Sequence, residues 1–504
     1  MSQPTATALS YPQGAARVIL VLTAITCALL ELIDATVVNV SLREISGSIG
    51  ATTTEIAWVV TAYGISNVII IPLTGMLSNY FGRKAYFTTS VIIFTFSSLM
   101  CGMSTSLWTL VFWRFIQGLG GGGLLSNAQT IIMGPTFGPT IGGLITDNFS
   151  WHWIFFVNVP IGIIAAFLSY SFVTNDPSAV KPKRIDYWGI VFLIIGVGSL
   201  QFVLEEGNSK DWFDSSEIVF FTFLAILGFV LLIKRSLSID YAAVNLRLYQ
   251  NYNLVLGSVL NFLLGLILFG SVFIFPLFVQ ISLGWTATQT GMFMIPGALF
   301  SAFSMPIVGK MLGNGVNPKA IIWTGAGLTV VFLMMLSFSS PTSSQGNFYF
   351  PFVLRGIGMA CMMSPIITLS VAGLNPRDIG QAVGLSNAVR QLGGAVGIAL
   401  INLFLTQKNA QVRGSMLGYV TDYSQQTAER IAMMKQNFLA RGYSMDQAEA
   451  LANQSLEGML FKQQALVSYD HGFFMVGLMV LIIFPVVYLI RYKKKEKVVV
   501  SDGH

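Results

Sequence analysis

Three charged side chains inside apolar segments are the residues best suited to chemistry in this sequence: Glu31, Asp34 and Arg114. Ionised side chains are costly within a membrane and usually serve a pathway or a partner there. Glu31 and Asp34 are three residues apart, so one helical face would carry both carboxyl groups. Two such groups titrate as a coupled pair, and a carboxyl whose charge depends on solvent access is what a proton carrier needs.

Arg114 is the expected partner of Asp34. We expect the first helix to leave the membrane near residue 38 and the fourth to enter it near residue 108, which puts both side chains at similar depth. A pair that forms or breaks as a proton moves would link protonation to shape. The alternatives are a permanent structural ion pair or an arginine bonded to carbonyl groups. Glu31 could instead attract a cationic substrate or serve as a polar lining residue.

The composition predicts an all-α polytopic membrane protein. The chain has 504 residues, of which 54% are hydrophobic and only 10% charged, with a mean hydropathy of +0.69. Soluble domains carry about 25% charged residues. The sequence holds no nucleophile–histidine–acid set, P-loop or metal-ligand spacing, and its three cysteines lie in apolar spans. We therefore expect no enzyme activity, no metal or other cofactor and no nucleic-acid partner.

Apolar runs of about 20 residues, the length of a spanning helix, set the expected topology. They predict spans at 18–38, 56–76, 85–104, 108–133, 153–173, 187–204, 217–233, 253–279, 289–309, 320–338, 349–371, 381–405 and 469–490, with 134–146 as a short fourteenth. Lys and Arg gather in the segments that fourteen crossings place inside, whereas the short outside loops hold Arg43 and Lys210. Because cytoplasmic loops carry this excess, both termini are expected in the cytoplasm.

An internal repeat divides the chain into halves. Arg114 in WRFIQGLGGG has a counterpart in Arg355 of VLRGIGMAC, since each arginine lies within an apolar span and is followed by glycines. Duplicated halves around a central site are typical of secondary transporters. The predicted domains are an N-terminal bundle at 1–173, two linker spans at 174–249, a C-terminal bundle at 250–491 with an extracytoplasmic loop at 406–468, and a basic cytoplasmic tail at 492–504.

Five motifs together resemble the fourteen-helix drug:proton antiporters of the Major Facilitator Superfamily, the EmrB/QacA type. They are LIDATVVNV at 32–40, GMLSNYFGRK at 75–84, RFIQG at 114–118, GPTFGPTIGG at 134–143 and WHWIFFVNVPIG at 151–162. The resemblance implies two pseudo-symmetric six-helix bundles with two extra central helices. It also implies a multi-pass protein of the bacterial cytoplasmic membrane that uses the proton gradient as its energy source.

The resemblance suggests roles for particular residues. Asp34 would be the membrane-embedded acid of proton coupling, whereas the family motif does not require an acid at Glu31. Arg355, the counterpart of Arg114 in the internal repeat, is expected to be structural. The gate-loop motif comprises Gly75, Asn79, Gly82, Arg83 and Lys84, in which Asn79 replaces the acidic residue of the family. The antiporter motif, which seals the outward side or simply packs closely, comprises Gly134, Pro135, Gly138, Pro139, Gly142 and Gly143.

The resemblance predicts export of amphipathic, hydrophobic or cationic small molecules by alternating access, or of one specific metabolite or siderophore. Against the family pattern, a basic loop and half of the fifth helix are absent between Met133 and Gly134. A half-helix cannot cross a bilayer unaided, so a transport-impaired remnant is the competing hypothesis. The polar segment 406–468 would contact a periplasmic adaptor, cover the pore as an amphipathic cap, or be disordered.

Overall fold

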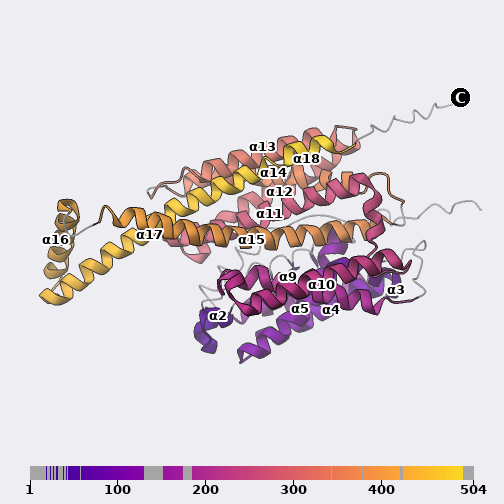
Figure 1. Ribbon diagram of the computed structural model, residues 1–504, viewed down its shortest axis with the longest axis horizontal. Coiled ribbons are helices and arrows are strands. Elements are labelled where there is room, and N and C mark those ends of the chain that lie inside the picture. The colour runs from indigo at the N-terminus through magenta and orange to yellow at the C-terminus, as the bar shows by residue number, and fades with distance from the viewer. Residues whose placement is uncertain are drawn as a thin grey trace, which may run out of the picture. The chain divides into compact units, whose positions relative to one another are not determined.

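The computed structural model contains only helices as regular elements in the part of the chain that it describes, as the all-α prediction requires (Figure 1). That part comprises selected positions between residues 19 and 41, then 44–129 without 57, 151–173, and 184–491 without 342, 376–377 and 421–423. The predicted antiporter motif at 134–143 and the basic tail at 492–504 lie outside these residues.

The chain divides into two compact units. The N-terminal unit holds α2 (Thr53–Ile56), α3 (Trp58–Phe81), α4 (Arg83–Gly102), α5 (Leu107–Gln129), α7 (Trp153–Phe156), α8 (Asn158–Phe172) and most of α9 (Tyr187–Glu206) and α10 (Ser216–Ser238). The C-terminal unit holds α11 (Tyr252–Ser282), α12 (Ala287–Gly313), α13 (Pro318–Leu336), α14 (Gly346–Ser370), most of α15 (Ile379–Leu417), α16 (Gln425–Ala440), α17 (Met445–Val480) and α18 (Ile483–Leu489).

Eleven helical stretches of the described part are long and apolar enough to cross a membrane. They coincide with eleven of the predicted spans, from 56–76 to 469–490. The predicted span at 108–133 is the helix α5, whose 23 residues give it a length of about 35 Å. Its arginine, glutamine and glycines lower its hydropathy, which is why composition alone does not single it out. The chain is a multi-pass membrane protein.

The glycine run of α5 lets this helix press against two neighbours at once. A Cβ atom on Gly120 would lie 2.7 Å from the backbone nitrogen of Phe94 in α4. A Cβ atom on Gly121 would lie 2.7 Å from the Tyr63 hydroxyl in α3. Consecutive glycines thus face different helices, and small residues allow backbones to approach closely inside membranes. The run holds α5 tightly between α3 and α4.

Helix α14 repeats this arrangement in the C-terminal unit. A Cβ atom on Gly356 would lie 2.9 Å from the backbone nitrogen of Ser301 in α12, and one on Gly358 would lie 2.7 Å from the Thr329 hydroxyl in α13. The internal repeat in the sequence therefore also appears in the helix packing. Helix α14 lies between α12 and α13, as α5 lies between α3 and α4.

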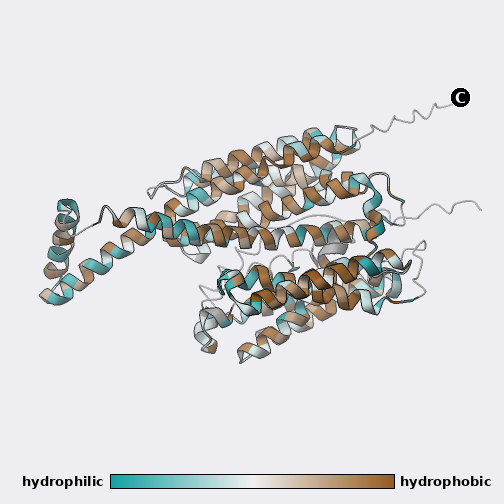
Figure 2. Ribbon diagram, viewed as in Figure 1, coloured by the Kyte–Doolittle hydropathy of each residue, from teal (hydrophilic) through white to brown (hydrophobic). Residues whose placement is uncertain are grey.

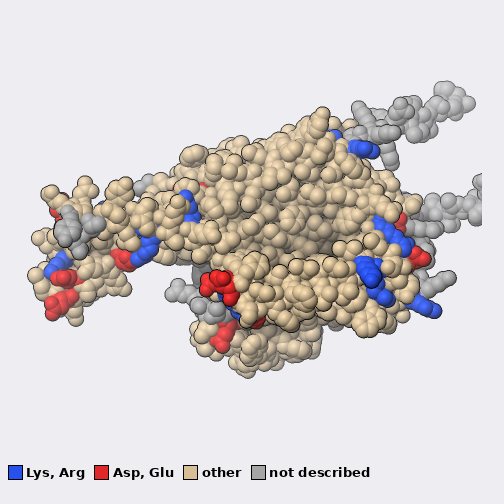
Figure 3. Space-filling view, in the orientation of Figure 1, with Lys and Arg blue, Asp and Glu red and all other residues tan. Residues whose placement is uncertain are grey.

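Most of segment 406–468, predicted as a loop, is helical. The helix α15 continues to Leu417, and α16 and the first half of α17 form a helical hairpin (Figure 1). Lys435 and Glu449 join the two arms at 2.6 Å. The hairpin carries many hydrophilic residues, with charged side chains of both signs (Figures 2 and 3).

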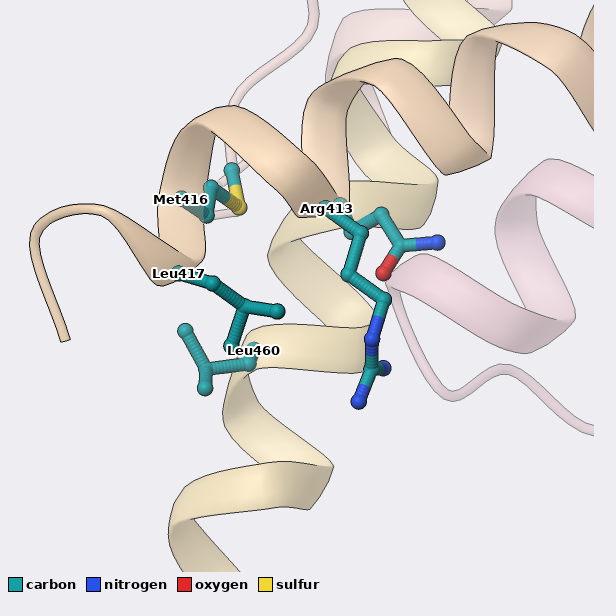
Figure 4. Close-up of a pocket in the computed structure, with 5 residues that line it drawn as sticks. Arg413, Met416, Leu417 and Leu460 are labelled. Carbon is teal, nitrogen blue, oxygen red and sulfur yellow. The ribbon is translucent and has the colours of Figure 1, made fainter. Parts of the chain in front are cut away.

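A shallow pocket lies at the base of this hairpin, where the end of α15 meets α17 (Figure 4). Arg413, Met416, Leu417 and Leu460 line it. The guanidinium of Arg413 is bound to Glu457 at 2.5 Å, so the charge there already has a partner. The pocket lies where the hairpin meets the apolar part of the C-terminal unit.

Candidate functional site

The charged residues singled out in the N-terminal unit meet in its interior. Asp34 is 0% exposed and Arg114 1% exposed. The Nη1 atom of Arg114 donates a hydrogen bond to Oδ2 of Asp34, at 2.5 Å. The expected contact is present, and it joins the first helix to α5. Its role in proton coupling stays a prediction.

Two amide side chains complete the shell around the Asp34 carboxylate. Its Oδ1 atom accepts hydrogen bonds from Nε2 of Gln117 at 2.8 Å and from Nδ2 of Asn158 at 3.1 Å. Both amides are fully buried. Both carboxylate oxygens therefore have donors, which compensates the loss of hydration that burial imposes on an ionised group. The charge of Asp34 is balanced by one guanidinium and shared over two amides.

Sequence reasoning missed Gln117 and Asn158. Both stand in motifs that were recognised, RFIQG and FVNVP, and both are uncharged polar residues within apolar segments. Gln117 is three residues after Arg114, so the two side chains leave the same face of α5. That spacing was the available signal for Gln117, whereas Asn158 at the start of α8 comes near Asp34 only through tertiary packing.

Arg114 is held on several sides. Its Nε atom donates to the carbonyl oxygen of Val59 in α3 at 3.2 Å, and its Nη1 atom also donates to Oε1 of Gln117 at 2.9 Å. Its Cζ atom lies 4.1 Å from the ring centroid of Tyr63 and 5.8 Å from that of Phe155. The guanidinium thus has an anion, two neutral acceptors and aromatic faces, all of which favour a buried cation.

The network continues into α4. Asn158 donates through the same Nδ2 atom to the hydroxyl of Ser98 at 3.2 Å, and Ser98 donates to the carbonyl oxygen of Phe155 at 3.0 Å. The thiol of Cys101 lies 3.6 Å from Oε1 of Gln117. A change of charge at Asp34 would therefore act on hydrogen bonds to α3, α4, α5 and α8 together.

Glu31 is buried one turn before Asp34 but binds another helix. It is 2% exposed, and its Oε1 atom accepts a hydrogen bond from Nδ2 of Asn67 in α3 at 3.3 Å. The expected shared face is thus present, with two carboxyl groups in one interior. Asp34 contacts α5 and α8, whereas Glu31 contacts α3.

The gate-loop residues connect α3 to α4. Gly82 has a φ of 88°, a backbone conformation that glycine adopts readily and other residues rarely do, and it makes the turn between the helices. Lys84 lies over the ring of Tyr170 in α8, 4.6 Å from its centroid. A Cβ atom on Gly75 would lie 3.3 Å from Cα of Gln381 in the first turn of α15. Arg83 is exposed and Asn79 half-buried.

Arg355 has surroundings unlike those of Arg114. It is 5% exposed in α14, and its Cζ atom lies 5.7 Å from the ring centroid of Phe352. Among the described residues, its Nε atom has no hydrogen-bond partner and no carboxylate forms an ion pair with it. The repeat therefore preserves the arginine but not its counter-ion.

Buried ionic and amide groups in a bundle of apolar helices, together with duplicated helix packing, are typical of secondary transporters. Comparison with known proteins agrees: the sequence matches the Major Facilitator Superfamily over residues 24–134 and 131–398. The chain belongs to this superfamily, in the branch of the EmrB-type exporters.

Two relatives represent that branch. The multidrug export protein EmrB of Escherichia coli K12 is 28% identical over 92% of this chain and 94% of its own. The fatty acid resistance protein FarB of Neisseria gonorrhoeae is 28% identical over 96% of this chain and 98% of its own. Among solved structures, the human organic anion transporter TETRAN superposes with a TM-score of 0.51 at 11% identity, covering 93% of this chain and 100% of its own. That likeness concerns the fold, and it confirms the predicted fold class.

Proposed function

We propose that the protein exports amphipathic, hydrophobic or cationic small molecules across the cytoplasmic membrane of a bacterium, driven by the proton gradient, with both termini in the cytoplasm. The observation that carries this proposal is the buried Asp34–Arg114 pair and its amide shell. The proton gradient is the energy source, and no bound cofactor is required. The EmrB and FarB relatives support an exporter.

Protonation of Asp34 would change the stability of this network. In the ionised state the buried charges of Asp34 and Arg114 cancel. Adding a proton leaves the guanidinium as an unbalanced buried cation, which is costly. A rearrangement that gives Arg114 another partner or water then becomes favourable, and the four helices joined by the network must move with it. This coupling is the physical basis we propose for alternating access.

Glu31 supplies a second carboxyl group in the same interior. We propose that it either shares the titration of Asp34 or attracts a cationic part of the substrate. Protonation of Glu31, or substrate binding to it, would then change its hydrogen bond with Asn67 in α3. A neutral variant, Glu31→Gln, separates the two roles: reduced export of cationic dyes alone indicates substrate attraction, and reduced proton exchange with all substrates indicates coupling.

A narrower substrate range is the close alternative. FarB is named for resistance to fatty acids, a single chemical class, while EmrB is named for multidrug export. An exporter of one metabolite or siderophore would use the same proton chemistry. Export assays with a panel of cationic, neutral and anionic amphiphiles distinguish the two.

The helical hairpin of α16 and α17 is the proposed contact with a periplasmic adaptor protein. Its polar surface and its projection beyond the apolar part of the C-terminal unit support this role. Deleting residues 425–443 should abolish copurification with an adaptor while leaving export from vesicles intact. Loss of both would instead indicate that the hairpin is part of the transport unit.

A transport-impaired remnant is the second candidate function. The match to the superfamily comes in two pieces that meet at 131–134, the junction where the expected loop is absent. If the chain is inactive, inserting a family-like loop and half-helix after Met133 should restore export. Activity of the unaltered chain would rule the remnant out.

The decisive experiment is proton-driven dye transport into everted membrane vesicles, whose cytoplasmic face is outside. Asp34→Asn should abolish efflux while the protein remains in the membrane at its normal amount. Lys210→Gln, which alters a half-buried charge paired with Glu217, is the matched control and should transport normally. Unchanged efflux in Asp34→Asn would remove the central role of this residue.

A further inference from the structure

One face of α3 contacts both the ion pair and the second buried carboxyl group, and Tyr63 stands in its middle. One turn before Tyr63, the carbonyl oxygen of Val59 accepts a hydrogen bond from Nε of Arg114 at 3.2 Å. One turn after it, Nδ2 of Asn67 donates to Oε1 of Glu31 at 3.3 Å. The Tyr63 ring itself lies 4.1 Å from Cζ of Arg114. Because residues four apart share a helical face, Tyr63 lies between these two polar contacts.

The hydroxyl of Tyr63 is buried, and it makes no hydrogen bond within the part of the chain that the structure describes. It lies beside the amide of Asn67 without completing a bond to it, and the charges of Glu31 and Asp34 are near enough to act on it. A buried hydroxyl without a partner is unfavourable and calls for an explanation. A second arrangement of the same interior, in which this hydroxyl gains a partner, supplies one.

Helix α5 holds Tyr63 in this position through its glycines. A Cβ atom on Gly118 would lie 2.5 Å from the carbonyl oxygen of Tyr63. A Cβ atom on Gly121 would lie 2.7 Å from the Tyr63 hydroxyl and 3.2 Å from Nδ2 of Asn67. The hydroxyl and the amide therefore border the same position of α5, which is open only because a glycine stands there.

We propose that Tyr63 is a positioning residue that couples the protonation of Glu31 to that of Asp34. The inference rests on the proposed proton-driven export and deepens it by naming the link between the two acids. Ionised Glu31 holds the amide of Asn67 by a charge-assisted hydrogen bond, which a proton on Glu31 weakens. The amide can then turn to the Tyr63 hydroxyl. Since the ring of Tyr63 lies on Arg114, this change acts on the guanidinium that balances Asp34.

Few other groups in this interior can respond to pH. Among the described residues, the titratable or charged side chains that face Tyr63 are Glu31 and Asp34 from the first helix and Arg114 from α5. Helix α4 contributes the thiol of Cys101, which contacts Gln117. Arginine keeps its charge in proteins, and a thiol is mostly protonated at neutral pH. The pH response around Tyr63 therefore comes from the two carboxyl groups.

The test is an infrared titration of the carboxyl groups on the full chain in phosphatidylcholine nanodiscs, with Glu31→Gln and Asp34→Asn to assign the two bands. Glu31→Gln removes a neighbouring negative charge, so it should lower the midpoint of the Asp34 band by about one pH unit, as expected for coupled groups. In a Tyr63→Phe background, which keeps the ring on Arg114, the same replacement should lower the midpoint by less than about half as much.

Gly121→Ala keeps the Tyr63 hydroxyl but displaces it from Asn67, so it should reduce the coupling in the same way and serves if Tyr63→Phe does not fold. Tyr349→Phe, which removes a hydroxyl from an exposed tyrosine of the C-terminal unit, should preserve the full shift.

The proposal is overturned if Glu31→Gln leaves the Asp34 midpoint in place, or if the full shift persists in either folded variant, Tyr63→Phe or Gly121→Ala. The titration needs neither a proton gradient nor a dye, so this result would leave proton-driven export standing. Conversely, a wild-type protein that shows the coupling but transports no dye would contradict the export function alone.

Discussion

The two central helices of the repeat, α5 and α14, share one packing solution but differ in their charge. Each lies between two neighbours through glycines, and each carries a buried arginine. Arg114 is paired with Asp34 and bonded to Gln117 and Val59, whereas the described residues offer Arg355 only the ring of Phe352.

Each half of the repeat thus contains a buried arginine, but the surroundings of the two arginines differ. In α5 the cation belongs to a neutral, hydrogen-bonded network, so its removal leaves a buried carboxylate without a counter-ion. In α14 the removal of the cation takes away an unbalanced charge. The same substitution at the two arginines should therefore have different effects on the stability of the protein.

The largest expected effect is on stability. Arg114→Gln should destabilise the protein by about 3–5 kcal/mol, the usual cost of leaving one member of a buried pair alone. Arg355→Gln should leave stability unchanged or raise it, since no carboxylate loses its partner. Thermal unfolding of both variants in the same detergent measures the contrast. Equal destabilisation would show that Arg355 has a structural counter-ion after all.

A double variant sharpens the same comparison. Asp34→Asn combined with Arg114→Gln removes both charges, so it should recover much of the stability lost in Arg114→Gln alone. It should not recover proton-driven efflux, because no titratable group remains at this position. Additive losses in the double variant would mean that the two side chains do not interact energetically.

The next largest effect concerns the glycines at which α5 and α14 each contact the backbone of a neighbouring helix. Gly120→Ala and Gly356→Ala should each cost about 1–3 kcal/mol, because the new methyl group would meet backbone atoms that cannot move aside. Gly327→Ala in α13 is the matched control, since a Cβ atom there meets nothing within 4 Å. That control should be neutral or stabilising, as alanine favours a helix over glycine. Thermal unfolding and expression level compare the three.

A smaller effect is expected at the amides. Gln117→Met should lower stability by about 1–2 kcal/mol, because Asp34 and Arg114 each lose one hydrogen bond in a buried network. The ion pair itself remains, so efflux should be reduced but present. Chemical unfolding and vesicle efflux measure the two quantities. Complete loss of efflux with unchanged stability would give Gln117 a direct part in proton transfer.

The smallest effect lies at an exposed carboxylate, which contrasts with the buried one of Asp34. The Thr52 backbone N–H and hydroxyl donate to Glu55 at the start of α2, and these bonds lower the pKa of the Glu55 carboxyl below its ordinary value. A lowered folded-state pKa stabilises at pH above the ordinary value, and this stability is lost as pH falls through the lowered pKa. The protection factors of the α2 amides, which correct for the intrinsic pH dependence of exchange, should therefore fall at acidic pH, and Glu55→Gln should remove most of that dependence. Equal pH dependence in both proteins would contradict this role.

Much of the fold and part of the candidate site could be predicted before the structure was known. The spans, the repeat and the meeting of Asp34 with Arg114 follow from hydropathy, glycine spacing and helix depth. Gln117 was indicated only by its three-residue spacing from Arg114. Asn158 could not be predicted, because an uncharged amide in an apolar helix can bond a neighbouring carbonyl group as well as a carboxylate. The helices within 406–468 were predicted as a loop, since a polar helix leaves no hydropathy signal.

The sequence by itself determined that this chain crosses a membrane many times, that its halves repeat, and that each half buries an arginine. These properties depend on the local cost of moving side chains from water into an apolar medium, which is summed along the chain without knowledge of neighbours. Only the tertiary structure decided which arginine has an anion and which neighbour each glycine of α5 meets. Those outcomes depend on the rotation and contact of helices distant in sequence, and a charge is stabilised or destabilised by the groups that such packing brings to it.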